Sequence, residues 1–316
     1  MLCKITNKEG VFLLRKNRIG QSSLFVSEIG LGCMSLGTDE NKAREIITKA
    51  LDLGINYFDT ADLYDFGLNE AIVGNAIREN RDNVILATKV GNSFEKGKSG
   101  WDWDPSKAYI KSAVKKSLHR LQTDYIDLYQ LHGGTIEDNM EETIEAFEEL
   151  VEEGVVRYYG ISSIRPNVIK SYVQKSNIIS VMMQYSILDR RPEEEILDLL
   201  FDHHISVIAR GPLAKGLLTE KFTEKLSDST YIDYTSEELT KLLPILKQRF
   251  TNKSLTNAAL QYSSYHPAVA SVIPGASSID QLLENVEQML AGPISVEEYQ
   301  WIQANSKENI YNSHRN

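Results

Sequence analysis

Four side chains that can hold or move a proton follow three apolar runs of this chain. The first run, residues 54–59, ends at Asp59 and is followed by Tyr64, while the next two runs end at Lys89 and His132. A lysine ammonium beside a phenol favours the phenolate, and a carboxylate paired with that lysine keeps it charged and in place. A histidine nearby can donate a hydrogen bond to an oxygen beside the phenol. Together these groups would protonate an oxygen that is gaining negative charge.

Carbonyl reduction needs such a proton donor, because the carbonyl oxygen gains negative charge as its carbon accepts a hydride. It also needs a hydride source. Each residue has an ordinary structural explanation as well: Asp59 as a turn or cap, Tyr64 as packing, Lys89 reaching solvent and His132 bridging loops. Their arrival at three successive strand ends argues against coincidence.

The three runs belong to a longer alternation of apolar segments with helix-patterned segments. Strands are expected over residues 27–33, 54–59, 84–89, 125–132, 155–161, 179–184, 205–210 and 269–273, each followed by a helix, with a further amphipathic segment at 295–306. Strands this uniformly apolar are typical of parallel sheets buried on both faces. An open doubly wound sheet is the competitor, but the first strand–helix turn, residues 30–37, lacks the third glycine of the dinucleotide fingerprint.

The sequence therefore predicts an α/β protein with a single (β/α)8 TIM barrel and its site at the carboxyl ends of the strands. Residues 14–316 are expected to form this one domain. Residues 1–13 follow no periodic pattern and are interpreted as an amino-terminal extension that is not integral to it.

Composition argues against several classes of function. The formal charge is −10, with acidic residues in helix-like runs, which disfavours binding to nucleic acid or to an anionic membrane. The two cysteines give no disulfide framework and no metal-ligand spacing, and a reducing cytoplasm suits them. No run approaches the ~20 apolar residues of a membrane span. We expect a cytoplasmic protein without a metal, present as a monomer or weak homo-oligomer.

A set of short motifs spread in order over residues 18–290 resembles the aldo-keto reductase superfamily, and most closely its bacterial, general-stress-protein-like branch. The motifs are Asp59-Thr60-Ala61-Asp62-x-Tyr64, Thr88-Lys89-Val90, Gln130-Leu131-His132, Gly160-Ile161-Ser162, Gln184-Tyr185, Gly211-Pro212-Leu213-x-x-Gly216 and Ile273-Pro274-Gly275. Any one of them is weak alone, whereas the ordered set is highly specific.

The resemblance implies an NADPH-dependent oxidoreductase that reduces aldehydes or ketones. Tyr64 would be the general acid, Lys89 and Asp59 would tune it, and His132 would orient the carbonyl. Relatives in this branch begin near Leu14, so residues 1–13 are also interpreted as a gene-calling artefact.

The same resemblance implies a set of cofactor contacts across the barrel mouth. They are Cys33, Met34, Ser162, Ser163, Gln184, Arg210, Gly211, Pro212, Leu213, Lys215, Gly216, Gly275, Ser277, Gln281, Glu284 and Asn285. Ser162, Ser163 and Gln184 match positions that hold the nicotinamide carboxamide, and burial is the preferred explanation for Cys33. Arg210 stands where many members place a tyrosine under the nicotinamide. Its charge would oppose the oxidised, cationic ring and so favour the reduced cofactor.

Two departures from the family pattern affect cofactor and substrate. Many relatives grip the 2′-phosphate with a basic residue, where this chain has Ser277, Ser278 and Gln281. Neutral donors at a helix amino terminus still bind phosphate, so NADPH is preferred over NADH by a narrower margin. Some relatives carry tryptophans just after the lysine and the histidine, where this chain has glycines. Trp101 or Trp103 would then form the aromatic wall of the substrate pocket, unless they only pack the loop down.

Two alternatives remain open from the residues. Part of the superfamily uses bound NADPH for regulation, so a redox sensor or regulatory subunit with little turnover is one. A metal-dependent barrel hydrolase using Asp59, Asp62 and His132 is the other, and it is disfavoured because Lys89 would compete for the carboxylates.

Overall fold

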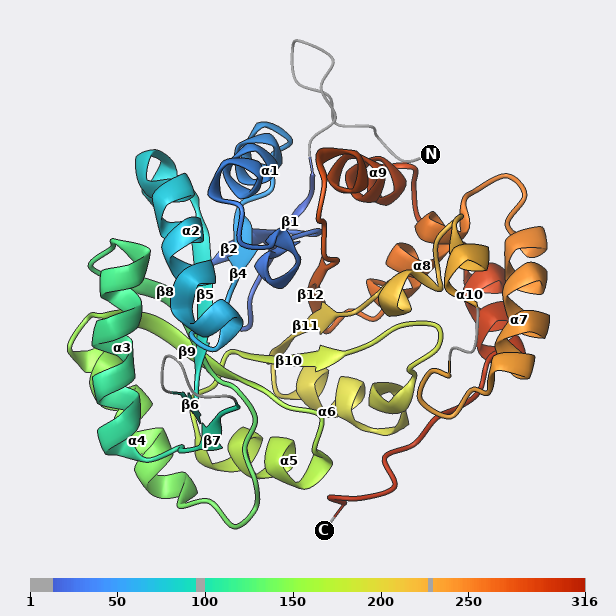
Figure 1. Ribbon diagram of the computed structural model, residues 1–316. Coiled ribbons are helices and arrows are strands. Elements are labelled where there is room, and N and C mark those ends of the chain that lie inside the picture. The colour runs from blue at the N-terminus through green and yellow to red at the C-terminus, as the bar shows by residue number, and fades with distance from the viewer. Residues whose placement is uncertain (1–13, 95–99, 227–229, 316) are drawn as a thin grey trace.

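The computed structural model describes residues 14–94, 100–226 and 230–315, and eight of its strands form one parallel barrel (Figure 1). The strands are β3 (Leu31–Gly32), β4 (Tyr57–Asp59), β5 (Ile85–Val90), β8 (Ile126–Leu131), β9 (Val156–Ser162), β10 (Ser180–Gln184), β11 (Ser206–Arg210) and β12 (Val269–Ile273). Parallel bridges from Ile29 to Val272 and from Gly32 to Gly275 join the first strand to the last. The predicted (β/α)8 barrel is confirmed. The interpretation of residues 1–13 lies outside the described residues.

Helices surround the barrel (Figure 1). They are α1 (Glu40–Asp52), α2 (Leu68–Ile77), α3 (Lys107–Leu121), α4 (Met140–Glu152), α5 (Pro166–Lys175), α6 (Ile196–Asp202), α7 (Ser236–Arg249), α8 (Leu255–Ser263), α9 (Ile279–Leu290) and α10 (Val296–Asn305). Side-chain oxygens of Asp39, Ser106 and Ser278 accept hydrogen bonds from the first turns of α1, α3 and α9 and so fix where these helices begin. Within the described ranges, no helix is both long enough and apolar enough to span a bilayer.

An antiparallel hairpin closes the amino end of the barrel. Strands β1 (Lys16–Arg18) and β2 (Phe25–Ser27) pair with each other. The apolar side chains of Ile19 and Leu24, from the hairpin, are buried with Tyr57 and Met182 in a cluster separate from the core between sheet and helices. With this end filled, the carboxyl end of the barrel remains for a site.

The expected first strand, 27–33, is two segments in the structure. Ser27 ends β2, and the barrel strand β3 begins only at Leu31. The Ser27 hydroxyl donates to the carbonyl of Ile29, and the Asn56 side-chain amide donates to the carbonyl of Phe25. These side-chain bonds serve backbone groups that a continuous strand would use in its ladder, so the chain changes direction here.

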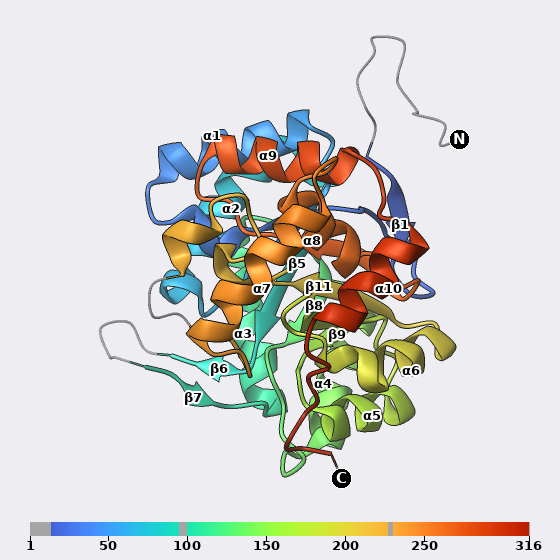
Figure 2. The same ribbon diagram turned by 90° about the vertical axis from the view of Figure 1, so that its right-hand side faces the viewer.

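A second hairpin, β6 (Asn92–Ser93) with β7 (Asp102–Trp103), extends from the carboxyl end of β5, beside the mouth of the barrel (Figure 2). It belongs to the long loop that was expected after Lys89.

Candidate active site

Asp59, Lys89 and Tyr64 form one hydrogen-bonded group at the carboxyl ends of β4 and β5. The Lys89 ammonium donates to Asp59 Oδ1 at 2.5 Å, to the Thr60 carbonyl at 2.7 Å and to the Tyr64 hydroxyl at 3.3 Å. An ammonium has three donors, and all of them are used here. Asp59 Oδ2 accepts from Gln130 Nε2 at 3.3 Å.

The Lys89 side chain is charged although it is only 1% exposed. Burial alone would lower the pKa of Lys89, but Asp59 and Tyr64 outweigh burial and hold this pKa above its ordinary value. The ammonium also lies 4.9 Å from the centre of the Tyr64 ring. A fixed positive charge therefore faces the phenol oxygen, as the sequence led us to expect.

His132 completes the predicted group of four and is neutral. Its ring meets the Tyr64 ring edge to face, with centroids 5.9 Å apart. Burial, followed by the positive charges of Lys89 and Arg210, lowers the pKa of His132 to about 3. A neutral imidazole donates from one nitrogen only, so His132 can act as a hydrogen-bond donor but not as a cationic acid.

A strained turn presents Tyr64. The two residues after it, Asp65 and Phe66, have φ angles of 49° and 54°, a left-handed conformation that costs roughly 1–2 kcal/mol per non-glycine residue. Arg120 packs directly against Gly67, so a Cβ there would lie 2.8 Å from the arginine side chain. Because the contacts around the turn force it into this shape, the direction of Tyr64 is set by the fold.

Behind this turn lies a buried carboxyl that the proton-donor chemistry does not require. Asp62 is 1% exposed, and its Oδ1 has no hydrogen-bond partner among the described residues. Burial and the nearby Glu70 raise the pKa of Asp62 to about 8. Glu70 itself is paired with Arg120 at 2.6 Å. Asp62 is therefore mainly protonated at neutral pH.

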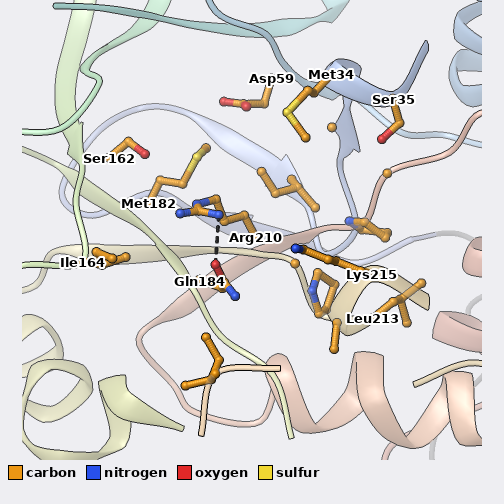
Figure 3. A pocket seen from close by; sticks show the side chains of 18 of the residues that line it. Met34, Ser35, Asp59, Ser162, Ile164, Met182, Gln184, Arg210, Leu213 and Lys215 are labelled. Atoms are coloured by element: carbon orange, nitrogen blue, oxygen red, sulfur yellow. Dashed lines mark hydrogen bonds between the residues drawn. The ribbon is translucent and has the colours of Figure 1, made fainter. Parts of the chain in front are cut away.

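The four residues open into one cavity of about 1460 Å³. Of the sixteen expected cofactor contacts, fifteen line it; Figure 3 shows several of them around Arg210. Cys33 does not line the cavity. Its side chain is fully buried, and burial raises the pKa of its thiol, which suits the packing role expected for it.

Trp103 occupies the space that two glycines leave open. A Cβ on Gly91 would lie 2.7 Å from its ring, and a Cβ on Gly133 would lie 3.2 Å from it. The indole nitrogen donates to Asp138 at 2.9 Å, which fixes the ring. Trp101 also lines the cavity and is 55% exposed. The indole of Trp103 therefore lies next to Gly91 and Gly133, close to where the sequence analysis noted tryptophans in some relatives.

The sequence of the chain matches the model of the Aldo/keto reductase family over residues 28–307. The chain belongs to this family. Among curated proteins, the Uncharacterized oxidoreductase YqkF of Bacillus subtilis (strain 168) is 60% identical over 306 residues, covering 96% of this chain and 100% of that protein. Members of the aldo/keto reductase family are oxidoreductases that generally use nicotinamide cofactors.

Two solved structures of aldo/keto reductases share the fold. The holo form of aldo-keto reductase AKR11C1 from Bacillus halodurans has a TM-score of 0.92 and 58% identity, covering 96% of this chain and all of that one. The glycerol dehydrogenase AKR11B4 from Gluconobacter oxydans has a TM-score of 0.81 and 25% identity, covering 92% and 94% of the two chains.

Sequence reasoning missed the part of this aldo/keto reductase's cavity that comes from irregular segments. Tyr231, Ile232 and Asp233 reach it from the turn before α7, and residues 310–314 reach it from beyond α10. Neither segment has periodicity or a family motif. The only available signal was the apolar pair Ile310-Tyr311 after the last predicted helix.

Proposed function

We propose that this chain reduces aldehydes and ketones to alcohols with NADPH, and that Tyr64 is the general acid. The observation that carries the proposal is the position of the Tyr64 hydroxyl within 3.3 Å of an ammonium that Asp59 holds in place. The bound cofactor would supply the hydride. Tyr64 gives its proton to the carbonyl oxygen, Lys89 stabilises the phenolate left behind, and neutral His132 donates a hydrogen bond to the same oxygen.

The size of the cavity supports the proposed binding of a dinucleotide together with a substrate. Its volume of about 1460 Å³ exceeds the ~300–1,000 Å³ typical of pockets for drug-sized ligands. Thr256, on α8, lines it with a buried hydroxyl that has no hydrogen-bond partner in the described part of the chain. Such a group suits a polar ligand atom, as a dinucleotide would provide.

The preference for NADPH over NADH rests on basic side chains that line the same cavity. The amino terminus of α9 offers few donors to a phosphate. The backbone N–H and the hydroxyl of Ser277 both already donate to the side-chain oxygen of Gln281, and Asp280 adds a negative charge. Lys215 and Lys221 line the cavity from the loop after β11. We infer that these lysines supply the positive charge for the 2′-phosphate that the residues near Gly275 lack.

The part of the cavity left for a substrate is apolar at its rim. The cavity is lined there by Trp101, Ile164, Ile232 and Ile310, whose side chains are at least 36% exposed. Burying such surface stabilises a complex with an apolar ligand. Carbonyl compounds with alkyl or aromatic substituents are therefore the proposed substrates, with Trp101 and Trp103 as walls.

The test measures oxidation of NADPH and of NADH with a panel of alkyl and aryl aldehydes and ketones. We expect turnover with NADPH, a smaller kcat/KM with NADH, and loss of turnover in Tyr64→Phe with the Kd for NADPH retained. Tyr158→Phe is the matched control, because its hydroxyl is bonded to Ser23 in the hairpin that closes the amino end of the barrel, away from the reacting group. Full activity in Tyr64→Phe would refute the assignment. Tight NADPH binding without turnover on the whole panel would favour a redox sensor.

A further inference from the structure

The side-chain amide of Gln184 is occupied at both ends by this chain. Gln184 and Arg210 end neighbouring strands and are paired in register. Arg210 Nη1 donates to Gln184 Oε1 at 3.2 Å, the bond drawn as a dashed line in Figure 3. Gln184 Nε2 in turn donates to the Tyr231 hydroxyl at 2.8 Å. A chain of three side chains therefore ends at the guanidinium in the cavity wall.

Tyr231 is a fixed end for this chain of bonds. It is 5% exposed, and its backbone exchanges two hydrogen bonds with Tyr234, at 3.1 and 2.9 Å. This turn is fastened to the segment after α10, since the Lys307 backbone donates to the Tyr234 hydroxyl at 2.5 Å and Asn309 Nδ2 donates to Asp233 at 3.0 Å. The hydroxyl of Tyr231 is thus placed by elements outside the barrel strands.

We propose that Tyr231 is a positioning residue that holds Arg210, through Gln184, in the orientation that makes the site prefer the reduced cofactor to the oxidised one. The inference rests on the proposed function, because it concerns the nicotinamide cofactor of that reaction. A guanidinium is planar and always charged, so its effect on a cationic ring depends on where it is held. An arginine free to swing toward water would be screened and would discriminate less.

The hydrogen bonds add a second part to the one expected for Gln184. With its oxygen bonded to Arg210 and its nitrogen to Tyr231, this amide acts on the arginine. A second lone pair on its oxygen and a second N–H remain for the cofactor. Removing the Tyr231 hydroxyl leaves Gln184 Nε2 without its acceptor, and the amide is free to rotate away from Arg210.

The experiment measures the dissociation constants of NADP+ and NADPH by fluorescence and calorimetry, which need no turnover. The unaltered protein should bind NADPH more tightly. In Tyr231→Phe the ratio of the two constants should move toward one by roughly three- to tenfold, the range that one neutral hydrogen bond accounts for. Gln184→Leu breaks the middle of the chain and should lower the ratio similarly.

Two controls separate positioning from a general structural role. Tyr129→Phe removes another buried hydroxyl, one that makes no hydrogen bond among the residues described and does not line the cavity, and should leave the ratio unchanged. In an Arg210→Met background, Tyr231→Phe should have no further effect. The inference is overturned, and the proposed function is not, if folded Tyr231→Phe keeps the ratio of the two dissociation constants unchanged. The same holds if Tyr231→Phe changes this ratio equally in the presence and absence of Arg210. Binding of neither cofactor by the unaltered protein overturns the proposed function together with the inference.

Discussion

Lowering the pH to 5 should destabilise this protein through His132, and replacing that residue with glutamine should remove the effect. The pKa of His132 is lowered to about 3 in the folded protein, first by burial and then by Lys89 and Arg210, whereas an unfolded histidine has a pKa of ~6.5. Below pH ~6.5 the unfolded chain therefore binds a proton that the folded chain refuses, and stability falls as the pH falls. At pH 5 the gap is ~1.5 units, and at ~1.36 kcal/mol per unit the loss is about 2 kcal/mol. Part of the ring reaches the cavity, so solvent screening makes this an upper figure.

The assay is urea unfolding at pH 8 and pH 5 for the unaltered protein and for His132→Gln. Between these two conditions the unaltered protein should lose up to about 2 kcal/mol more than the variant. His203→Gln, an exposed position after α6, serves as the matched control and should behave like the unaltered protein. Nuclear magnetic resonance of labelled histidine gives the direct reading. An imidazole at position 132 that takes up its proton near pH 6.5 would refute both the electrostatic reasoning and the assignment of His132 as a neutral hydrogen-bond donor.

Three further changes test other parts of the structure. Lys89→Met leaves Asp59 buried without its cation and should lower the free energy of unfolding, measured in urea, by roughly 3–5 kcal/mol. The double variant that also carries Asp59→Asn should recover part of this loss, whereas additive losses from the two changes would contradict a coupled pair. Asp62→Asn should flatten the pH dependence of stability above pH ~4. The reason is that the folded protein keeps, until about pH 8, a proton that the unfolded chain releases at pH ~3.9. The same shift in urea midpoint between pH 5 and pH 8 for the variant and the unaltered protein would count against this. Gly74→Ala places a Cβ 2.4 Å from the Leu121 carbonyl oxygen and should lower stability by about 1–3 kcal/mol; an unchanged melting temperature would show that α2 and α3 are less tightly packed.

The barrel and the meeting of Asp59, Tyr64, Lys89 and His132 were predictable because both depend on short-range patterns. Apolar runs of strand length specify strands, and the residue after each run lies at the same end of a parallel barrel. The group of Asp59, Lys89, Tyr64 and His132 follows from this rule without long-range information. The break between β2 and β3 was not predictable, because Ser27, where β2 ends, donates its backbone N–H to the side chain of Asn56, 29 residues away.

The remaining wall of the cavity depends on contacts between distant segments. Trp103 lies against Gly91 and Gly133 through the folding of a loop, and no spacing in the sequence encodes that approach. The hydrogen bond from Gln184 to Tyr231 joins positions 47 residues apart. Such contacts are fixed by tertiary packing. A single sequence shows which residue types are present but not which distant residues come into contact.

The ion pair of Asp59 and Lys89 also bears on how the barrel reaches its correct strand alignment. Strands β4 and β5 pair with Phe58 opposite Leu86 and Asp59 opposite Ala87. Sliding one strand by a single residue would turn its alternate side chains to the other face, separating the two charges while both strands stayed buried. A lone buried charge costs several kcal/mol, a penalty that a slip among apolar side chains alone would not carry. The pair on which the proposed mechanism depends thus also penalises misaligned barrels, and variants lacking both charges should refold more slowly or to a mixture of products.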